Sequence, residues 1–588
     1  MKGFDVLKVK SAVKQRNKFD LSRSHLTTMD FGQIVPLFVE ETVPGDKFKV
    51  FGEYFSRMAP LVKPTYGKFS FKTVSAFVPY HQVAWDSDAF FAGKTSWEGT
   101  TPHIRYILMS DLVQYFMDYC FSSGTSASFD FSYMDSNNVL QYRKLTTKGK
   151  YYLKVLNALG YTLPQVDNSV ASQWTTVVKN MKLNALPLLA FFKLYNDYMS
   201  QSQRFNTSAL STFLQGVKYG KSVTGFIPST GAINKSGIKT MFDNLLLNYE
   251  NDYFTSAWAT PNNAISNQEN INGLNVPGSL NTYNEKVLST FEDNRLLSDT
   301  DTVNGTSITA FGQRALDFLR SFDDWVRRNN YSGSRAVQQV YSRFGIKTDD
   351  YRSHYANVIS TDTMPVAVGD VTAVADSSNV PLGDYAGKGI MNGSKGFDVS
   401  VSDYGLIIVL GYFTVVPMNS FGFDRRVLRV DPLDFYNPEF DGIGADAISL
   451  GEVYSSPRAV ADGDQTGDNQ VFGFTERYNS YRYGRDVISG EFRDYRSNGD
   501  MNTWHTGRNL AAVRKAGNLV AQSSSMNTLA QTDSEYNRIF SVTSGTVDHF
   551  YMTARFNVSA VRPMLNLNQV VRLGEGDTAV PRNGNVIN

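Results

Sequence analysis

The 588-residue sequence has few cysteines and few charged residues. Cys120 is the only cysteine, so no disulfide can form within the chain, and a disulfide-stabilised secreted scaffold is excluded. Charged residues make up 19% of the chain, below the roughly 25% usual for soluble domains, whereas aromatic residues make up 13%. Surfaces that join subunits are rich in aromatic residues and poor in Lys, Glu and Asp, so this composition is compatible with self-association. A large β protein without such contacts fits the composition equally well.

An excess of charge of one sign is also absent. Lys and Arg together number 57 and Asp and Glu 56, which excludes a globally basic nucleic-acid-binding protein. The longest apolar run, residues 404–417, is too short to cross the ~30 Å hydrocarbon core of a membrane as a helix, and residues 1–10 contain no apolar signal core. We therefore expect a protein that is not inserted in a membrane and whose nucleic-acid contacts are local.

Strand patterns dominate both ends of the chain. Pro44 and Gly45 favour a tight turn between the first two predicted strands, and a hairpin is the simplest arrangement. Five segments rich in apolar and β-branched residues predict strands: 31–42, 47–58, 68–80, 403–416 and 547–561.

Helical periodicity appears between these strands. Pro187 lies near the start of one predicted helix, and Gly345 follows another as a C-terminal cap would. The predicted helices are 103–120, 185–199, 308–328 and 334–345, and segments rich in Asn, Ser, Gly and Asp predict loops at 258–307, 455–470 and 519–545. Together the patterns predict a mainly β protein, a sandwich whose connections have grown into subdomains.

Several long strings occur along the chain, including FDLSRSHLTTMDFGQIVPLFVEETVPGDKF (19–48), LNALPLLAFFKLYNDY (183–198), SGSRAVQQVYSRFGIKTDDYR (332–352), DPLDFYNPEFDGIG (431–444) and VFGFTERYNSYRYG (471–484). Through these strings, in this order, the chain resembles the major capsid proteins of microviruses, small icosahedral single-stranded DNA bacteriophages, and especially their gokushovirus-like branch. The resemblance covers most of the chain. Leu189, which stands where the family pattern has Arg, is one of the departures that indicate a divergent member.

The resemblance implies a fold and a domain organisation. The fold would be an eight-stranded jelly roll of the viral capsid type with long loop and helical insertions. Residues 1–18 would form a basic N-terminal arm, and residues 19–588 a single jelly-roll capsid domain. The inserted subdomains would lie at about 86–250, 258–360 and 440–545.

The resemblance also implies a function. The chain would be a structural protein, not an enzyme, whose copies self-assemble in the host bacterial cytoplasm into a T=1 icosahedral shell around a circular single-stranded DNA genome, so that the protein is found in the virion. The expected partners are other copies of the chain, the packaged DNA, minor virion proteins such as a small DNA-binding protein and a pilot protein, and a receptor on the host-cell surface. No cofactor and no metal are expected.

Two other classes of function are alternatives. A jelly-roll carbohydrate-active enzyme could use carboxylate pairs such as Asp323 and Asp324 as acid and base, although helix starts and turns explain such pairs more often. Trp504 beside His505 could stack a sugar or a base, but a packed aromatic ring next to a hydrogen-bonded histidine is the commoner arrangement. The six histidines form no metal-binding motif. A host-binding spike or adhesin would be expected to show shaft repeats or a signal peptide.

A basic segment near the N-terminus is the first candidate for contact with DNA. Residues 8–18 contain five cations and no acid, and they lack the apolar periodicity that would place them on a core. They predict an arm that reaches phosphates, and a solvated tail without a ligand is the alternative. The cations are Lys8, Lys10, Lys14, Arg16 and Lys18.

The second candidate is residues 476–485, where arginines and tyrosines interleave. These residue types combine attraction to phosphates with stacking on the bases of single strands. On a strand, alternate residues face opposite sides, so packing in the core or against another subunit is the alternative. The residues are Arg477, Tyr478, Tyr481, Arg482, Tyr483 and Arg485.

Overall fold

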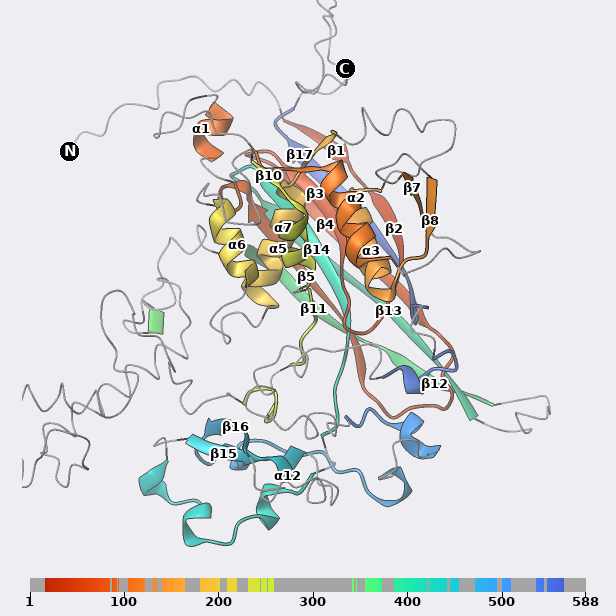
Figure 1. Ribbon diagram of the computed structural model, residues 1–588, viewed down its shortest axis with the longest axis vertical. Coiled ribbons are helices and arrows are strands. Elements are labelled where there is room, and N and C mark those ends of the chain that lie inside the picture. Colours follow the sequence, from red (N-terminus) through yellow and green to blue (C-terminus); the bar gives the residue numbers. More distant parts are fainter. Residues whose placement is uncertain are drawn as a thin grey trace, which may run out of the picture.

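The structure is a computed structural model, and most of its ordered elements lie in one layered body (Figure 1). It describes residues 16–84, 87–92, 94, 104–121, 131–134, 140–163, 180–200, 209–218, 231–243, 245–250, 252–257, 341–342, 345, 355–372, 385–419, 422–441, 445–453, 471–493, 500–508, 536–543 and 547–564.

Two antiparallel sheets form the centre of this body. Sheet A has the order β1–β17–β4–β13–β12, and sheet B the order β11–β5–β14–β3. Sheet A contains β1 (Asn17–Asp20), β17 (Phe550–Arg562), β4 (Lys47–Met58), β13 (Tyr385–Ser400), β12 (Ala367–Thr372) and β2 (Arg23–Met29), which also pairs with β17. Sheet B contains β11 (Asn357–Pro365), β5 (Phe69–Pro79), β14 (Gly405–Val415) and β3 (Ile34–Thr42). Because β1 and β2 pair with opposite ends of β17, they share one edge position of sheet A.

The two sheets face each other across an apolar core. Phe38 of sheet B and Phe556 of sheet A have ring centroids 5.0 Å apart, and Tyr54 of sheet A and Phe71 of sheet B have centroids 5.7 Å apart. All four side chains are buried. Burying an aromatic side chain removes about 150–250 Å² of surface from water, so these contacts are the main attraction between the sheets.

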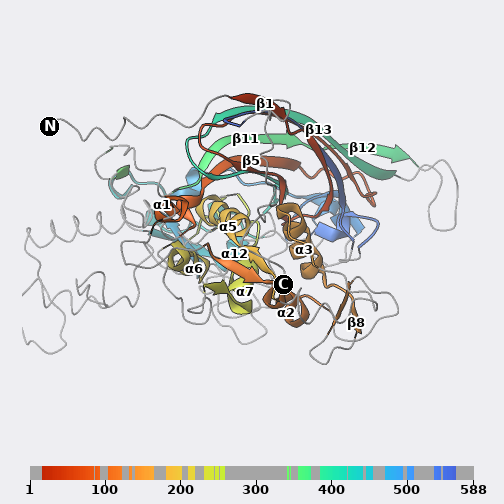
Figure 2. The same cartoon turned by 90° about the horizontal axis from the view of Figure 1, so that it is seen from above.

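Helices cover the outer face of sheet B. In Figure 2 the layers follow one another as sheet A, sheet B and helices. Helix α3 packs on β3, and α5 packs on β5 and β14. As a result β14 is buried along nearly its whole length on both faces, whereas β4 and β17 alternate between buried and exposed residues. The helices are α1 (Ser87–Ala92), α2 (Met109–Tyr119), α3 (Thr147–Leu159), α5 (Leu186–Tyr198), α6 (Ala209–Lys218), α7 (Lys235–Asp243) and α12 (Leu450–Val453).

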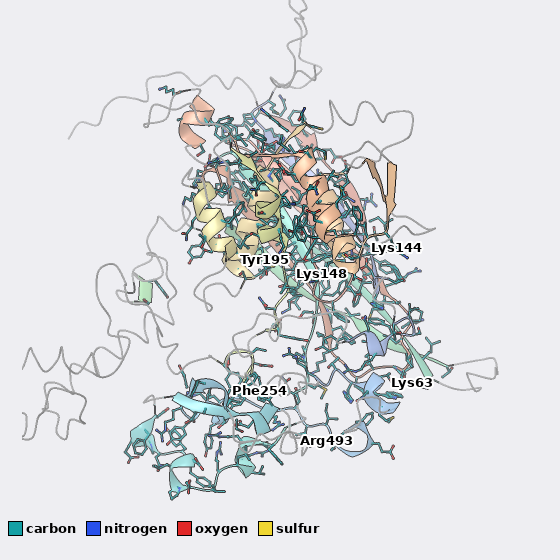
Figure 3. The ribbon with its side chains drawn as sticks, in the orientation of Figure 1. Lys63, Lys144, Lys148, Tyr195, Phe254 and Arg493 are labelled. Carbon is teal, nitrogen blue, oxygen red and sulfur yellow. The ribbon has the colours of Figure 1, made fainter. Side chains whose placement is uncertain are left out.

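Smaller elements complete the described part. Strands β15 and β16 with α12 enclose a separate apolar cluster that contains Phe254, Ile448 and Phe472, and Figure 3 shows Phe254 there, below the main body. The other short strands are β6 (Tyr106–Leu108), β7 (Phe131–Met134), β8 (Leu140–Arg143), β9 (Lys182–Asn184), β10 (Ala232–Ile233), β15 (Ala445–Ser449) and β16 (Val471–Glu476). The 3-10 helices are η2 (Tyr80–Gln82), η8 (Arg425–Val427), η9 (Pro432–Asp434), η10 (Pro438–Phe440), η12 (Asn479–Tyr481), η13 (Gly490–Phe492), η14 (Asp500–Trp504) and η15 (Asn537–Ile539).

All five predicted strands are present, but the predicted hairpin is wrong. Strand β3 lies in sheet B and pairs with β14, whereas β4 lies in sheet A between β13 and β17. The turn itself is tight, because Gly45 has a φ of +93° and the Asp46 carboxylate accepts the N–H of Val43 at 2.9 Å. Turn chemistry therefore reverses the chain here, while the pairing of β3 with β14 and of β4 with β13 and β17 places the two strands in opposite sheets.

The predicted helices have mixed outcomes. Residues 185–199 contain α5, but in 103–120 the helix begins only at Met109, after the short strand β6. The helix predicted at 308–328 lies outside the described residues, as does most of 334–345. Gly345 has a φ of +68° and donates its N–H to the carbonyl of Tyr341 at 2.8 Å, as expected of a C-terminal cap.

The predicted loops are only partly described. The loops 258–307 and 455–470 lie outside the described residues. The end of the third, 519–545, is not a polar surface loop: Tyr536, Ile539 and Phe540 are fully buried in the main core. The prediction of a loop followed from the polar residues that make up most of this segment, and these outweighed the short apolar stretch at its end.

Candidate functional site

The segment that follows β16 is not a strand. Strand β16 ends at Glu476, and η12 begins at Asn479, so the side chains of residues 477–485 do not alternate between two faces. Tyr478 joins the two elements with a φ of +61°, and among the described residues it is the one non-glycine with positive φ. Its N–H donates to Asp446 at 2.8 Å, which holds this uncommon backbone conformation.

The three arginines of this segment contact protein groups. The Arg477 guanidinium lies 4.9 Å from the centroid of the Phe440 ring, and Arg482 donates to Asp441 at 2.8 Å and to Glu476 at 3.2 Å. Arg485 donates to the backbone carbonyls of Asn419, Gly422 and Phe423. Tyr478 is buried, whereas Tyr481 and Tyr483 are nearly half exposed. The geometry favours the packing alternative for the arginines, and DNA contact by this segment stays a prediction.

A cavity of about 660 Å³ lies beside this segment. Its charges are mostly paired: Arg425 donates to Glu452 at 2.9 Å, and Arg426 to Asp424 at 2.7 Å. The bond from Arg426 lowers the pKa of Asp424, the opposite of what a general acid needs. Carboxylates outnumber guanidinium groups in the lining, so a phosphate is not favoured there either. The charged lining residues are Arg425, Arg426, Arg429, Arg485, Glu250, Asp252, Asp424, Glu452 and Asp486.

The pair Trp504 and His505 is packed into the protein. The Trp504 ring stacks on Tyr66 with centroids 5.7 Å apart. His505 is 4% exposed; its Nε2 lies 3.0 Å from the carbonyl oxygen of Phe492, and its Nδ1 accepts the N–H of Gly507 at 2.9 Å. The arrangement matches the structural alternative, a packed aromatic ring next to a hydrogen-bonded histidine.

Part of the basic N-terminal segment is visible. Lys8, Lys10 and Lys14 lie outside the described residues. Strand β1 begins at Asn17, so Lys18 belongs to sheet A, where it is exposed and pairs in register with Val561. The segment therefore reaches the protein body at the edge of sheet A.

An exposed apolar ridge, which we define as residues 423–440, lies beside β15 in the lower part of Figure 1. None of the residues in its 3-10 helices η8, η9 and η10 is buried. Seven large apolar side chains of the ridge are 38–81% exposed: Phe423, Val427, Val430, Leu433, Phe435, Tyr436 and Phe440. Sequence reasoning used part of this segment only for its resemblance and missed the exposure, because apolar residues normally predict burial.

Local polar bonds hold the ridge in shape. Asp434 accepts the backbone N–H groups of Val430 and Asp431 at 3.1 Å, and these bonds lower its pKa. The Asn437 side chain donates to the carbonyls of Pro432 at 3.3 Å and Phe435 at 3.1 Å. The ridge thus presents its apolar groups on a preformed backbone, as preorganised binding surfaces do.

Two further findings concern only the described part of the chain. Within it, no group of three or more His, Cys, Asp or Glu side chains could hold a metal ion. No helix among those residues is long and apolar enough to cross a membrane.

Comparison with known proteins gives consistent matches. A family described as capsid protein (F protein) matches residues 7–107 and 160–570. The capsid protein VP1 of Chlamydia phage 1 is 24% identical over 558 residues, which cover 86% of this chain and 88% of that protein. The capsid protein VP1 of Bdellovibrio phage phiMH2K is 22% identical over 531 residues, which cover 83% and 84%. The family match includes every strand of sheets A and B and the whole apolar ridge, whereas α2 and α3 lie entirely in the gap between the two matched segments.

Proposed function

The chain belongs to the capsid protein (F protein) family of bacteriophages, and from this premise we propose that its copies assemble into a T=1 icosahedral shell that encloses a circular single-stranded DNA genome. The role is structural. The single observation in the geometry that supports assembly is the apolar ridge.

The exposed area of the ridge is suited to a subunit contact. Its seven apolar side chains are on average about half exposed. At about 200 Å² for each of the four aromatic side chains, and somewhat less for Val427, Val430 and Leu433, they offer on the order of 700 Å², close to the ~800 Å² that each partner buries in a standard interface. The ridge contains four carboxylates and three guanidinium groups, a net charge of −1, so it lacks the excess of cations that binding to nucleic acid needs. A neighbouring copy of the chain is therefore the proposed partner.

We also propose that the two sheets are the two halves of an eight-stranded jelly roll. Counting β1 and β2 as one interrupted edge strand, sheet A offers four positions, β1/β2, β17, β4 and β13, and sheet B offers β3, β14, β5 and β11. Strands that follow one another in the sequence mostly lie in opposite sheets, as jelly-roll winding requires. In this proposal residues 19–588 form one capsid domain with insertions at about 86–250, 258–360 and 440–545, and residues 1–18 form an arm.

The remaining parts of the proposal rest on the family. Assembly would take place in the host bacterial cytoplasm, and the mature protein would be part of the virion. A buried Cys120 without a disulfide is compatible with a reducing compartment. Minor virion proteins, such as a small DNA-binding protein and a pilot protein, and a host-cell receptor would be further partners.

The ridge provides the test. Val430→Glu with Leu433→Glu places charge on two of its exposed side chains, which are 81% and 58% exposed, so the subunit should fold but not assemble. Negative-stain images of the parent protein should contain uniform closed particles, and those of the variant free subunits with an unchanged circular dichroism spectrum. Leu26→Ser, at a residue that is 83% exposed on sheet A, is the control and should leave assembly intact. A parent protein that stays monomeric in phage-producing cells would contradict the proposed function.

A further inference from the structure

The outer face of sheet A, the face turned away from sheet B, is open. Along β4 and β17 every second side chain points into the core, and the side chains between them are exposed or half exposed. We define the outer face by the outward side chains of five strands, β1, β2, β17, β4 and β13. They are Lys18 and Asp20 on β1, Ser24, Leu26 and Thr28 on β2, the odd-numbered residues 551–561 on β17 and 47–57 on β4, and the even-numbered residues 388–400 on β13.

This face is basic although the whole chain is nearly neutral. It has three carboxylates, Asp20, Glu53 and Asp398, and a net charge of +3. Lys49 lies 4.0 Å from Asp398, but both side chains are at least 70% exposed, so water screens the pair. Among the described residues no ion pair neutralises the other five cations of the face. The six cations are Lys18, Lys47, Lys49, Arg57, Lys388 and Arg555.

Aromatic side chains stand between these cations. Phe51 is 42% exposed and Tyr551 is 47% exposed, and Phe55 lies between them on β4 with the Arg57 guanidinium 5.5 Å from its centroid. Gly396 stands directly across from Phe51 in the register, and a Cβ there would come within 3.2 Å of the ring. The glycine thus leaves the face of Phe51 uncovered.

We propose that the outer face of sheet A binds single-stranded DNA through its phosphates and by base stacking, without reading the sequence. Cations beside exposed aromatic rings on an open sheet are the combination used by sequence-tolerant single-strand binders. A second copy of the chain fits this face less well, because the cores of protein interfaces are depleted of Lys. The face is also continuous with the basic arm: Lys18 and Lys47 flank Val561 in one cross-strand row.

The inference rests on the proposed function only in naming the DNA as the genome inside the shell. In that shell the outer face of sheet A would point inward and the helices over sheet B would point away from the DNA.

Binding of a fluorescein-labelled oligothymidylate by the full-length chain, measured by anisotropy at several salt concentrations, tests the cations. Lys47→Gln, Lys49→Gln and Arg555→Gln together should reduce the logarithmic salt slope by about 2, at ~0.7 for each lost phosphate contact. The matched control replaces Lys94, Lys148 and Lys182 by Gln; all three are exposed and none belongs to sheet A, and Figure 3 shows Lys148 on α3. An unchanged slope in the first variant, or an equal reduction in the control, overturns the inference.

The aromatic rings have a separate test. Tyr551→Ala should weaken oligothymidylate binding roughly five- to hundredfold, the range for loss of one stacked base, with little change in the salt slope. Tyr436→Ala on the apolar ridge is the control, because Tyr436 and Tyr551 are both 47% exposed. Equal affinities of the two variants would argue against stacking on this face.

Ultraviolet cross-linking inside intact particles then locates the contact. Adducts are expected on peptides that contain Phe51 or Tyr551. If the particles contain DNA but the adducts lie only in the helical layer, or if Lys47 and Lys49 cross-link to another copy of the chain, the inference fails while the proposed function stands. Closed particles that never contain DNA would instead contradict the proposed function, while an oligothymidylate slope that depends on Lys47, Lys49 and Arg555 would still support the inference.

Discussion

The ring of Phe413 lies parallel to the ring of Phe550, with centroids 3.9 Å apart and an interplanar angle of 11°. Phe413 belongs to β14 of sheet B and Phe550 to β17 of sheet A, and both side chains are fully buried. The stack therefore joins the central strands of the two sheets. Since strands β14 and β17 are about 140 residues apart in the sequence, the contact forms only when these two distant segments have come together.

Replacement of this ring should weaken the whole body. Phe550→Ala is expected to reduce the free energy of unfolding by about 3–5 kcal/mol, the range for a large-to-small change at a buried aromatic position. The urea unfolding midpoint of free subunits measures the effect. Phe435→Ala on the exposed ridge is the control and should change it by no more than about 0.5 kcal/mol. Equal stabilities of the two variants would contradict the assigned packing.

The sequence predicts this core well, because β-branched and aromatic runs identify strands whichever sheet they join. It does not predict to which of the two sheets each strand belongs. Pro44 and Gly45 predict a reversal of the chain, but a reversal within one sheet and a crossing to the facing sheet use the same turn residues. The choice between a hairpin and a crossing to the facing sheet depends on the strands with which β3 and β4 pair. Those partner strands are far away in the sequence.

Two local features of the sequence indicate structure beyond the elements predicted above. Helix α3 begins after Thr146, whose side chain accepts the N–H of Gly149, and ends at Gly160 with a φ of +95°. This is a complete set of start and stop signals for a helix that the sequence analysis did not predict. The alternation KFKVFGEYFSRM in β4 likewise marks a strand with one buried and one exposed face, and so indicates the outer face of sheet A.

The candidate site was harder to predict than the fold. The interleaved residues from Arg477 to Arg485 have the composition of a single-strand binder, yet the structure pairs Arg482 with Asp441 and places Arg485 on backbone carbonyls. A sequence pattern gives residue types but not the acceptors already beside them. The ridge shows the reverse case, in which apolar residues that look like core are held outside by Asp434 and Asn437.

Cys120 should be inert in the folded subunit. It is fully buried, and burial raises the pKa of its thiol to about 12, so almost no thiolate exists at neutral pH. A thiol-specific reagent should leave the native protein unmodified and should react with one thiol per chain in denaturant. Rapid labelling of native particles would contradict the placement of Cys120 under α3.

His505 should make the region around η14 sensitive to acid. Burial lowers its pKa below the usual ~6.5, and Nδ1 accepts the Gly507 N–H only when the ring is neutral. Because the folded-state pKa lies below the unfolded one, the stability contributed by His505 is present above about pH 6.5 and is lost as the pH falls through the folded value.

Urea midpoints compared between pH 7.5 and pH 5 should fall less in His505→Gln than in the parent protein. The exposed-carboxylate variant Asp398→Asn is the control and should behave like the parent; an identical fall in His505→Gln would rule out this role.

The basic arm gives the last prediction. Residues 1–18 are expected to point inward and to contact the packaged single-stranded DNA without reading its sequence, because Lys18 already lies on the outer face of sheet A. Replacing Lys8, Lys10, Lys14, Arg16 and Lys18 by Gln should leave the fold intact and reduce genome retention. At ~0.7 per phosphate contact on a single strand, the arm would contribute about 3 to the logarithmic salt slope. DNA retained in particles after washing at increasing salt measures the loss, and the variant with Gln at Lys94, Lys148 and Lys182 is the control. Unchanged retention and an unchanged response to salt, or an arm found on the outer surface of the particle, would exclude this role.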